Sequence, residues 1–415
     1  MKKLSLIFLT FAFFTLSACG GAINEVVPSI SAGGNHSLFL DADGRIWGWG
    51  VNIYAGVAEE EIRDLIKTPQ IINQVSGTRA LPKFSTVAAG ERFSIALDTR
   101  GNVWTWGWSG SQWEGDCLLG HGEIESFELR PRRIEDVPGF GNIVAISAGN
   151  RHSMALDING RIWTWGDRVQ SGFGPLEVSL RPRMLELDMN GAELPAFSKI
   201  SAGQHSMALD VYGRIWTWGQ GHHGHDTLWP VERPQMLTTG GLLDVSIALP
   251  EFVAIDNSIE SMALDVNGNI WTWGSRFPNT TILAQGWFNT RVGWHIPRQI
   301  VSNGNFTRTE IGPLPAFGAV AIGWAFAMAI DINGQVWSWG QNINGVLGLF
   351  LPNEFNADRP HKIAELTDIV AISAGFGFAI ALDSQNQLWT WGSNHTGQLG
   401  HGGQTSESGP RKVVF

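Results

Sequence analysis

A histidine-rich segment is the part of this sequence whose residue types most directly suggest metal chemistry. It contains His222, His223, His225 and Asp226, and imidazole and carboxylate groups are suitable ligands for zinc or nickel. The spacing matches no standard metal site, and histidine-rich loops often bind metal only adventitiously. We therefore keep the segment as a weak metal candidate and predict that the protein has no resident metal and no cofactor.

Other residues bear on acid–base and nucleophilic chemistry. Glu91 and Glu260 are the acids nearest the inner positions of the repeat described below, and paired carboxylates are what a polysaccharide hydrolase or lyase uses. They belong to copies three apart, so we expect them to lie too far apart for joint action. Cys117 is near His121, but a nearby histidine does not make a nucleophile, and we expect a tolerated free thiol. We predict no catalytic residue and no enzyme activity.

Charge and composition exclude other classes of protein. The 415 residues include 28 Lys and Arg against 38 Asp and Glu, a formal charge of −10. A nucleic-acid-binding domain is usually strongly basic, so we expect no nucleic-acid partner. Only 16% of the residues are charged and 43% are hydrophobic, which indicates a globular chain.

The amino terminus has the form of a secretory signal. Lys2 and Lys3 precede an apolar run from Leu4 to Leu16, and Leu-Ser-Ala-Cys ends at Cys19. This ending resembles the bacterial lipobox, which implies cleavage before Cys19 and lipid attachment to it. We therefore divide the chain into a signal peptide (1–18), a lipidated tether (19–29) and a folded body (30–415).

One unit recurs seven times in the body. Its hallmark is Trp-x-Trp-Gly, which begins at Trp47, Trp104, Trp163, Trp216, Trp271, Trp337 and Trp389. Before each copy runs Asp-x-x-Gly-x-(Ile/Val), relaxed in the last copy, and before that an apolar stretch, a pattern typical of two strands joined by a tight turn. A further apolar run ending in Gly lies upstream, and Pro-x-x-aliphatic follows downstream, as in Pro69–Ile72. Proline is tolerated on an edge strand.

Each unit thus supplies four strands, and four-stranded units repeated radially make a propeller. We predict an all-β, seven-bladed β-propeller. The chain starts with an inner run and ends with the outer run Pro410–Val414. We therefore expect strand 410–414 to join the first blade and close the ring, because closure removes exposed sheet edges.

Most repeated residues have structural explanations. Two Trp at positions i and i+2 of a strand point to one face, so we expect the pairs to pack between neighbouring blades. The seven Asp are expected to accept turn N–H groups and not to bind calcium. His36, His152 and His205 share a position with Phe93, Phe326, Phe378 and Glu260. This exchange favours packing with an optional hydrogen bond over catalysis.

The repeats also resemble a known family. Residues 147–166 and 391–402 are similar to the repeat of the regulator of chromosome condensation family. The resemblance spans about residues 29–415 and implies a seven-bladed propeller. Eukaryotic members exchange nucleotide on a small GTPase and touch chromatin, and the secretory signal and acidic body argue against both roles here. The secreted β-lactamase inhibitor protein II type of propeller is also similar, which makes inhibition of a secreted enzyme an alternative function.

Residues that differ between copies are the candidate binding residues. One set follows the inner-strand Gly, and we expect it to surround one mouth of the propeller: Asn35, Arg92, Arg151, Gln204, Trp324 and Phe376. The other set lies in loops after Trp-x-Trp-Gly: Trp108, Trp113, Trp229, Trp287 and Trp294. Loops on a rigid scaffold carry function, and Trp and Arg are favoured anchors.

These observations predict a lipid-anchored extracytoplasmic binding module, monomeric, with a protein or surface polymer as partner. Its location would be the outer membrane of a diderm bacterium or the cell surface of a monoderm. Inhibition of a secreted enzyme such as a β-lactamase is the first alternative, and a polysaccharide-acting hydrolase or lyase is the second.

Overall fold

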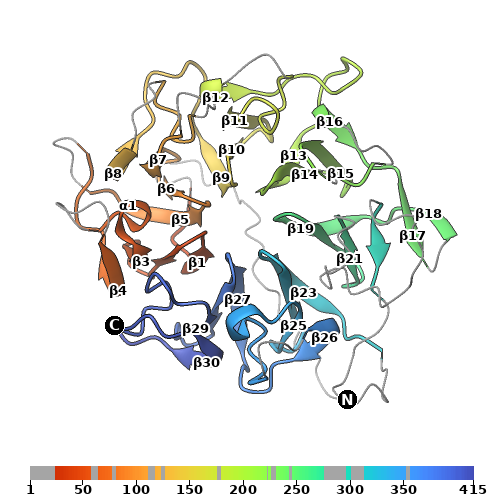
Figure 1. The fold of residues 1–415 in the computed structure, drawn as a ribbon. Helices are drawn as coiled ribbons and strands as arrows, with labels where there is room; N and C mark the ends of the chain where they lie inside the picture. Colours follow the sequence, from red (N-terminus) through yellow and green to blue (C-terminus); the bar gives the residue numbers. More distant parts are fainter. Residues whose placement is uncertain are drawn as a thin grey trace, which may run out of the picture.

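The structure is a computed structural model. It describes residues 24–57, 64–76, 81–110, 117–122, 127–174, 179–221, 223–225, 230–242, 245–274, 296–300, 313–351 and 356–415. These residues form seven β-sheets arranged as blades around a central axis (Figure 1). The predicted seven-bladed propeller is confirmed.

The blades repeat one order of strands from the axis outward. The innermost strands are β1 (Ser29–Ala32), β5 (Phe84–Ala89), β9 (Ile143–Ala148), β13 (Phe197–Ala202), β19 (Phe252–Asn257), β23 (Phe317–Ile322) and β27 (Ile369–Ala374). The second strands are β2 (His36–Leu40), β6 (Phe93–Asp98), β10 (His152–Asp157), β14 (His205–Asp210), β20 (Ser261–Asp265), β24 (Phe326–Asp331) and β28 (Phe378–Asp383).

The outer half of each blade carries the Trp-x-Trp-Gly motif and the proline. The third strands are β3 (Ile46–Val51), β7 (Val103–Trp108), β11 (Ile162–Gly166), β15 (Ile215–Gly219), β21 (Ile270–Trp273), β25 (Val336–Gly340) and β29 (Leu388–Gly392). The fourth are β4 (Leu65–Ile71), β8 (Phe127–Arg133), β12 (Ser179–Met184), β16 (Val231–Met236), β22 (Arg298–Gln299), β26 (Ala357–Lys362) and β30 (Glu407–Lys412). We number the blades 1 to 7 along the chain.

Blade 5 departs from four strands. Its outer strand β22 is two residues long and pairs in parallel with β17 (Thr239–Leu242), which forms a hairpin with β18 (Val245–Ala248), so the sheet has six strands. This hairpin extends outward from the ring (Figure 1). Helical structure in the described part of the chain consists of α1 (Asn52–Ala55) and the 3-10 helix η1 (Ile343–Gly345).

The hairpin signal has a single physical cause in every blade. In blade 1, Asp41 Oδ1 accepts the backbone N–H groups of Asp43 and Arg45, and its Oδ2 accepts Trp47 Nε1–H at 2.9 Å. The first Trp of every Trp-x-Trp-Gly donates to its own Asp in this way, at 2.9 to 3.4 Å. The prediction that these Asp fix turns is confirmed.

The second Trp of each pair is fully buried between blades. Trp106 of blade 2 lies in one cluster with Leu38 and Ile46 of blade 1, and Trp49 of blade 1 lies in one cluster with Phe378 and Leu382 of blade 7. The predicted packing of the Trp pairs between neighbouring blades is therefore confirmed, and the core is a ring of interfaces and not a single centre.

The predicted ring closure is wrong. Strand β30 does not join the first blade; it pairs with β29 of its own blade, with Trp389 opposite Lys412. Each blade instead takes all its strands from one continuous stretch of chain. The chain end still reaches blade 1, because the Phe415 ring packs edge-on against Trp47 with centroids 4.9 Å apart.

Two tiers of hydrogen bonds close the ring near the axis. In the first, the N–H group after an inner Gly donates to the Gly carbonyl of the next blade; across blades 7 and 1, Phe376 N donates to Gly33 O at 3.2 Å. In the second, the inner-strand Ser of blades 1, 3, 4 and 7 accepts an N–H from the next blade. Across blades 7 and 1, Ala32 N donates to Ser373 Oγ at 2.9 Å. A side chain at Gly375 would lie 2.6 Å from Gly33 O, which explains the glycine.

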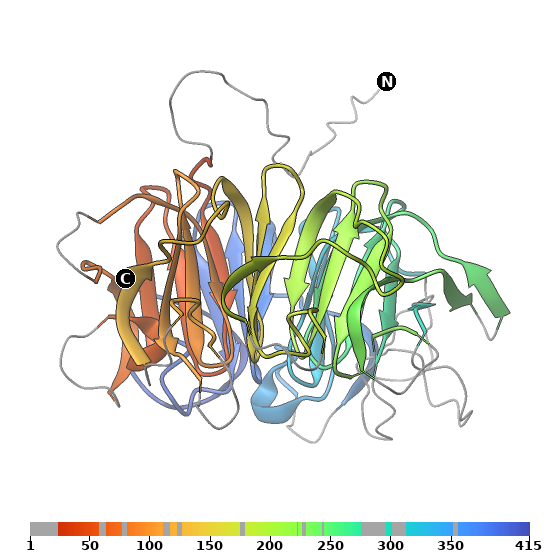
Figure 2. The ribbon, with the colours of Figure 1, turned by 90° about the horizontal axis from the view of Figure 1, so that it is seen from above.

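The propeller has two different faces. One, the turn face, carries the Asp-centred turns and the connections between blades. The other, the loop face, carries the loops after the inner Gly and the loops after Trp-x-Trp-Gly. Figure 2 shows the blades edge-on between these faces. Within the described residues, no helix is both long and apolar enough to cross a membrane.

Candidate functional site

The described residues of both predicted binding sets belong to the loop face. Trp108 N donates to Arg92 O at 2.9 Å and Asp167 N donates to Arg151 O at 2.8 Å, so the loop after each third strand is tied to the loop after the inner Gly. Asn35 is held similarly, because Val51 N donates to its carbonyl at 2.9 Å. The structure therefore brings Trp108, the described member of the second set, onto the same surface as the first set, which the sequence alone did not establish.

The loop face is charged over blades 2 and 3. The Arg92 guanidinium lies over the Trp108 ring, 5.3 Å from its centroid, and its Nε is 3.4 Å from Glu91 Oε1. In the next blade, Arg151 is 3.7 Å from Asp167. Arg92 keeps half of its side chain exposed, so the stacked pair presents a planar cation to solvent. Such a pair suits a carboxylate or an aromatic group of a partner.

The loop face is apolar over blades 6 and 7. Trp324 is 44% exposed, and Ile343 and Phe350 of the same blade are also exposed. Phe376 follows the inner Gly of blade 7 and lines the channel mouth. Ala325, directly after Trp324, has a φ of 71°, a conformation that costs energy in a residue with a side chain. Exposed aromatic anchors of this kind are favoured in protein interfaces.

Gln204 occupies the equivalent mouth position of blade 4. Its N–H donates to Ser258 O at 2.8 Å, and its carbonyl accepts Gln170 Nε2 at 3.3 Å, while the residue remains exposed. It separates the charged and apolar parts of the face. Four predicted residues, Trp113, Trp229, Trp287 and Trp294, lie outside the described residues.

A cavity of about 350 Å³ occupies the axis at the loop-face mouth. Its wall includes Ser31, Ser147 and Ser373, and also Asp256, which the sequence analysis did not select. Asp256 stands where blades 1, 3, 4 and 7 have Ser, and its Oδ2 accepts Ile322 N of the next blade at 2.9 Å. Enclosure in the channel raises the pKa of its carboxyl to about 6, against the lowering effect of that hydrogen bond. The sequence does contain a signal for Asp256, because an Asp replaces Ser at this position of the repeat.

The acids considered for catalysis do not meet. Glu91 lines the channel mouth, whereas Glu260 is buried inside its blade, and desolvation raises the pKa of Glu260 to about 7. Glu260 takes the repeat position of His152, whose Nε2 contacts Ser206 Oγ of the next blade at 2.7 Å. Burial lowers the pKa of His152 to about 3. These groups serve packing, as their exchange for Phe suggested.

The histidine-rich segment is partly scaffold. His225 Nε2 is 3.0 Å from Thr217 Oγ1, as His121 Nε2 is from Thr105 Oγ1. His223 is fully buried, and its carbonyl accepts the same Thr217 hydroxyl at 2.7 Å. His222 and Asp226 lie outside the described residues. Among the residues that the structure describes, no group of three or more His, Cys, Asp or Glu is placed to hold a metal ion.

Cys117 is buried, and desolvation raises the pKa of its thiol. A buried thiol with a raised pKa forms little thiolate at neutral pH, which makes it a poor nucleophile. This position agrees with the expected tolerated thiol. Cys19, the predicted lipidation site, is outside the described residues.

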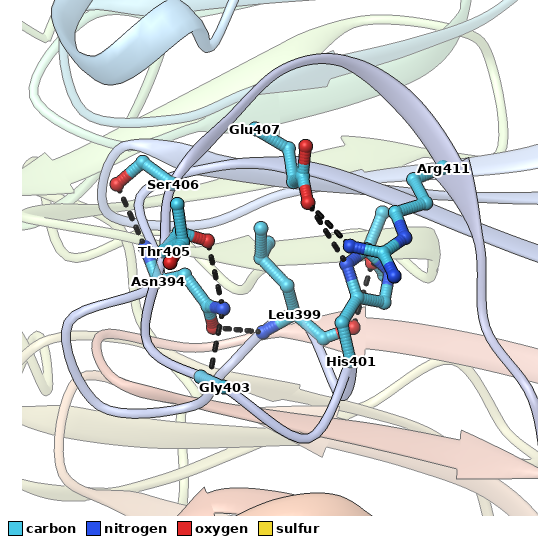
Figure 3. Close-up of polar contacts among 9 residues, drawn as sticks. Asn394, Leu399, His401, Gly403, Thr405, Ser406, Glu407 and Arg411 are labelled. Carbon is cyan, nitrogen blue, oxygen red and sulfur yellow. Dashed lines mark hydrogen bonds and ion pairs between the residues drawn. The ribbon is translucent and has the colours of Figure 1, made fainter.

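The loop after the third strand also braces the neighbouring blade. In blade 7, Asn394 holds the loop through Leu399 N, Gly403 O and Thr405 O, and Arg411 pairs with Glu407 at 2.6 Å (Figure 3). The loop's Gln398 carbonyl then accepts Trp49 Nε1 and Ser37 Oγ of blade 1, both at 2.7 Å. The loop face is therefore a rigid surface in this region, built by the same contacts that join blades 7 and 1.

Comparison with known proteins agrees with this architecture. The family model described as the regulator of chromosome condensation (RCC1) repeat matches residues 29–54, 84–112, 143–168, 319–346 and 369–398, and a second model of that repeat matches 333–382 and 385–415. The chain carries RCC1 repeats. Blades 4 and 5 lie outside the matched ranges, although the structure builds both as blades of the same ring.

Curated relatives are similar to this chain at low sequence identity. The Arabidopsis thaliana ultraviolet-B receptor UVR8 is 25% identical over 92% of this chain and 81% of its own length. The mitochondrial RCC1 domain-containing protein RUG3 of the same plant is 28% identical over 93% and 85%. The mouse E3 ubiquitin-protein ligase HERC2 is 25% identical over 93% of this chain, which spans only 7% of that protein.

Solved structures show the same fold. Human WBSCR16 superposes with a TM-score of 0.69 at 19% identity, covering 89% of this chain and 94% of its own. Prp20p from Saccharomyces cerevisiae, described together with its binding to Gsp1p and histones, gives a TM-score of 0.63 at 21% identity over 86% and 83%. At these identities the likeness concerns the fold of the RCC1 repeats, and function must be argued from the surface.

Proposed function

We propose that this RCC1-repeat propeller is a lipid-anchored, extracytoplasmic binding module that holds a protein or a surface polymer on its loop face. The observation that carries the proposal is the distribution of differences between repeats. Scaffold positions are nearly constant from blade to blade, while the two positions after the inner Gly differ between blades. Trp324 and Phe376 stand at the first of these positions, Arg92 and Arg151 stand at the second, and all four belong to the loop face. Variation concentrated on one face of a repeat scaffold is typical of a binding surface.

The chemistry of the loop face supports a protein partner over a small molecule. It combines a stacked Arg–Trp pair over blade 2 with the exposed aromatic side chains of blade 6 and the half-buried Phe376 of blade 7. Arg and aromatic residues are the side chains enriched at binding hot spots. The fold is compatible with this role, since Prp20p, which shares it, is described with its binding to Gsp1p and histones.

The Leu-Ser-Ala-Cys motif supports the anchor. Cys19 precedes Asn24 by five residues, and five residues span at most about 18 Å. Asn24 is fixed to the turn face, where its Nδ2 donates to Ile143 O at 3.0 Å. An anchor at Cys19 would therefore hold the turn face toward the membrane and leave the loop face directed away from it. The membrane would be the outer membrane of a diderm or the cell membrane of a monoderm.

Capture of the partner with matched variants tests the proposal. The full chain is compared with Arg92→Ala/Arg151→Ala, with Trp324→Ala/Phe376→Ala and with a turn-face control, Ile332→Ser. We expect at least one loop-face variant to lose tenfold or more of the retained partner, because truncating a hot-spot residue costs about 2 kcal/mol or more. The control should retain it fully. Equal retention by all four proteins would refute the loop face as the binding surface.

Inhibition of a secreted enzyme is a specific form of the same proposal, in which the loop face covers the partner's active site. It is tested by assaying β-lactamases with the purified protein. Inhibition that the Trp324→Ala/Phe376→Ala variant abolishes would support it, and undiminished β-lactamase turnover at saturating protein would exclude it.

A further inference from the structure

An apolar arc on the turn face is the largest feature that the loop-face proposal leaves unexplained. It consists of residues at the tips of the Asp-centred turns of blades 3 to 6, exposed between 40% and 65%: Ile158, Val211, Tyr212, Val266 and Ile332. We call this set the apolar arc. In blades 1, 2 and 7 the position after the turn Asp is instead Ala42, Thr99 or Ser384. The apolar choice is therefore confined to four consecutive blades.

The turns hold these side chains at one level. Each backbone N–H after the turn Asp donates to the connection from the preceding blade: Val211 N to Ala196 O at 3.1 Å, Val266 N to Glu251 O at 3.1 Å and Ile332 N to Ala316 O at 3.0 Å. Because the positions are equivalent in a ring of blades, the tips lie at similar height along the axis.

The surroundings of the apolar arc suit the boundary of a bilayer. Arg214 lies beneath the Tyr212 ring, 5.0 Å from its centroid, and pairs with Asp210 at 2.7 Å. Arg161 pairs with Asp157 in the same way beside Ile158. Both guanidinium groups remain nearly half exposed. Aliphatic and Tyr side chains flanked by Arg are typical of surfaces that enter the headgroup region of lipids.

The chain before the described residues leads to the same face. Asn24, the first described residue, is fixed on the turn face between blades 2 and 3, where its side chain donates to Asp98 O and Ile143 O. Blade 3 also carries Ile158, at one end of the apolar arc, and 23 residues precede Asn24 in the sequence. Those residues include the apolar run Leu4–Leu16 and Cys19. On the proposed function, this is where the lipid would be attached.

We infer that the turn face rests on the lipid surface and that the apolar arc inserts between the headgroups, so that the lipid on Cys19 and the apolar arc form two membrane contacts on one face. This inference rests on the proposed lipid anchor. It adds an orientation: the axis of the propeller stands across the membrane plane, and the loop face points outward. Two contacts on one face also resist tilting of the propeller more than one contact does.

Site-specific labels on the full, lipid-bearing chain in phosphatidylcholine vesicles test the inference. Val211→Cys and Val266→Cys carry an environment-sensitive fluorophore, and Ile343→Cys on the loop face is the matched control. Each replaced residue is exposed, so folding should be retained. We expect emission to rise at least twofold with a blue shift at both turn-face positions when vesicles are added, and to stay constant at position 343.

The outcomes separate this inference from the anchor. A chain that floats with the vesicles while both turn-face labels stay unchanged keeps the anchor and overturns the inference. A wild-type chain that does not float at all contradicts the anchor and the inference together. A third outcome is that the turn-face labels stay unchanged and light scattering shows a dimer, which the variant Val211→Ser/Val266→Ser/Ile332→Ser converts to monomer. The apolar arc would then contact a second copy of this chain, and the proposed lipid contact would be wrong.

Discussion

At the scale of single residues, one position of the repeat shows how the scaffold tolerates exchange. His152 and Phe93 occupy it in neighbouring blades, and each faces a Ser of the next blade. Ser206 Oγ donates to Gln170 O at 2.8 Å, so it must accept the proton of His152 Nε2. Ser153, opposite Phe93, donates to Leu118 O at 2.9 Å without that second bond. The histidine therefore adds one hydrogen bond to an arrangement that is complete without it.

The variant His152→Phe tests this interpretation. At pH 7 it should lose about 1 kcal/mol of unfolding free energy, the usual net contribution of one hydrogen bond. At acid pH the variant should instead be more stable than the wild type. The folded pKa, about 3, is below the ordinary value of 6.5, so the histidine's contribution is lost as pH falls from 6.5 toward 3. At pH 4 the wild type should therefore have lost on the order of 3 kcal/mol that the variant keeps.

Urea unfolding at pH 7 and at pH 4 measures both effects. The control is His395→Phe, because His395 is exposed on a loop of blade 7. This variant should not show the pH-dependent change in stability that we expect at the buried position 152. If His152→Phe remained less stable than the wild type at pH 4, the neutral, hydrogen-bonded state of His152 would be excluded.

Glu260 gives the opposite pH dependence at the same repeat position. Its folded pKa, about 7, is above the ordinary 4.5, so its contribution to stability is full below pH 4.5 and is lost as pH rises through 7. Replacing it with Gln should leave stability unchanged at pH 4 and raise it by on the order of 3 kcal/mol at pH 8. Thermal melting at the two pH values checks this. A variant that is destabilised equally at both would show that Glu260 is ionised and paired in the fold.

At the scale of elements, closure depends on contacts between inner strands rather than on a strand shared between the chain ends. Blades 7 and 1 approach closely at Gly375, where an added Cβ would lie 2.5 Å from Phe378 and 2.6 Å from Gly33 O. Phe376 N and Ser373 Oγ, which bond to blade 1, are immediate neighbours. Any displacement here would separate blades 7 and 1.

The variant Gly375→Ala should therefore destabilise the propeller by about 1–3 kcal/mol, the usual cost of overpacking a close contact. Gly141→Ala is a matched control, because no atom lies within 4 Å of the position of its Cβ and its backbone is in an ordinary region. Chemical denaturation of the two variants measures the difference. Equal stability would mean that the 7–1 contact is not what holds the ring together.

The elements also show which parts of the fold the sequence determines. Strand positions were predicted correctly because the apolar alternation and the Asp-centred turns are local patterns. The closure was predicted wrongly because a strand such as 410–414 has the same pattern whether it pairs with blade 7 or with blade 1. The blade with which this strand pairs is decided by chain continuity and by the Phe376–Gly33 and Ser373–Ala32 hydrogen bonds. These long-range contacts cannot be predicted from a local sequence pattern.

The candidate site was predictable to a similar extent. The sequence identified Arg92, Trp324 and Phe376 as variable positions, since repeat symmetry predicts where they lie around the mouth. It did not establish that they share a face with the loop after the third strand, because this follows from strand direction and from hydrogen bonds such as Trp108 N to Arg92 O. Asp256 was missed because it lies in the most degenerate copy of the repeat.

At the scale of the whole molecule, the two faces have different surfaces and, on our proposals, different partners. The loop face has charged residues over blades 2 and 3 and aromatic residues over blades 6 and 7. The turn face carries the apolar arc and the position of Asn24, from which the amino-terminal segment extends. A lipid at Cys19 and a partner on the loop face would thus lie at opposite ends of one axis.

The most direct test of this account is site-specific photocrosslinking in intact cells. A photoreactive residue is placed at Arg92 or Trp324 on the loop face, or at Tyr212 on the turn face, in the full chain. We predict that the loop-face positions yield one discrete adduct with a macromolecular partner, and that position 212 yields adducts with lipid. Discrete macromolecular adducts from position 212, with none from positions 92 and 324, would contradict the central claim that the loop face is the binding surface.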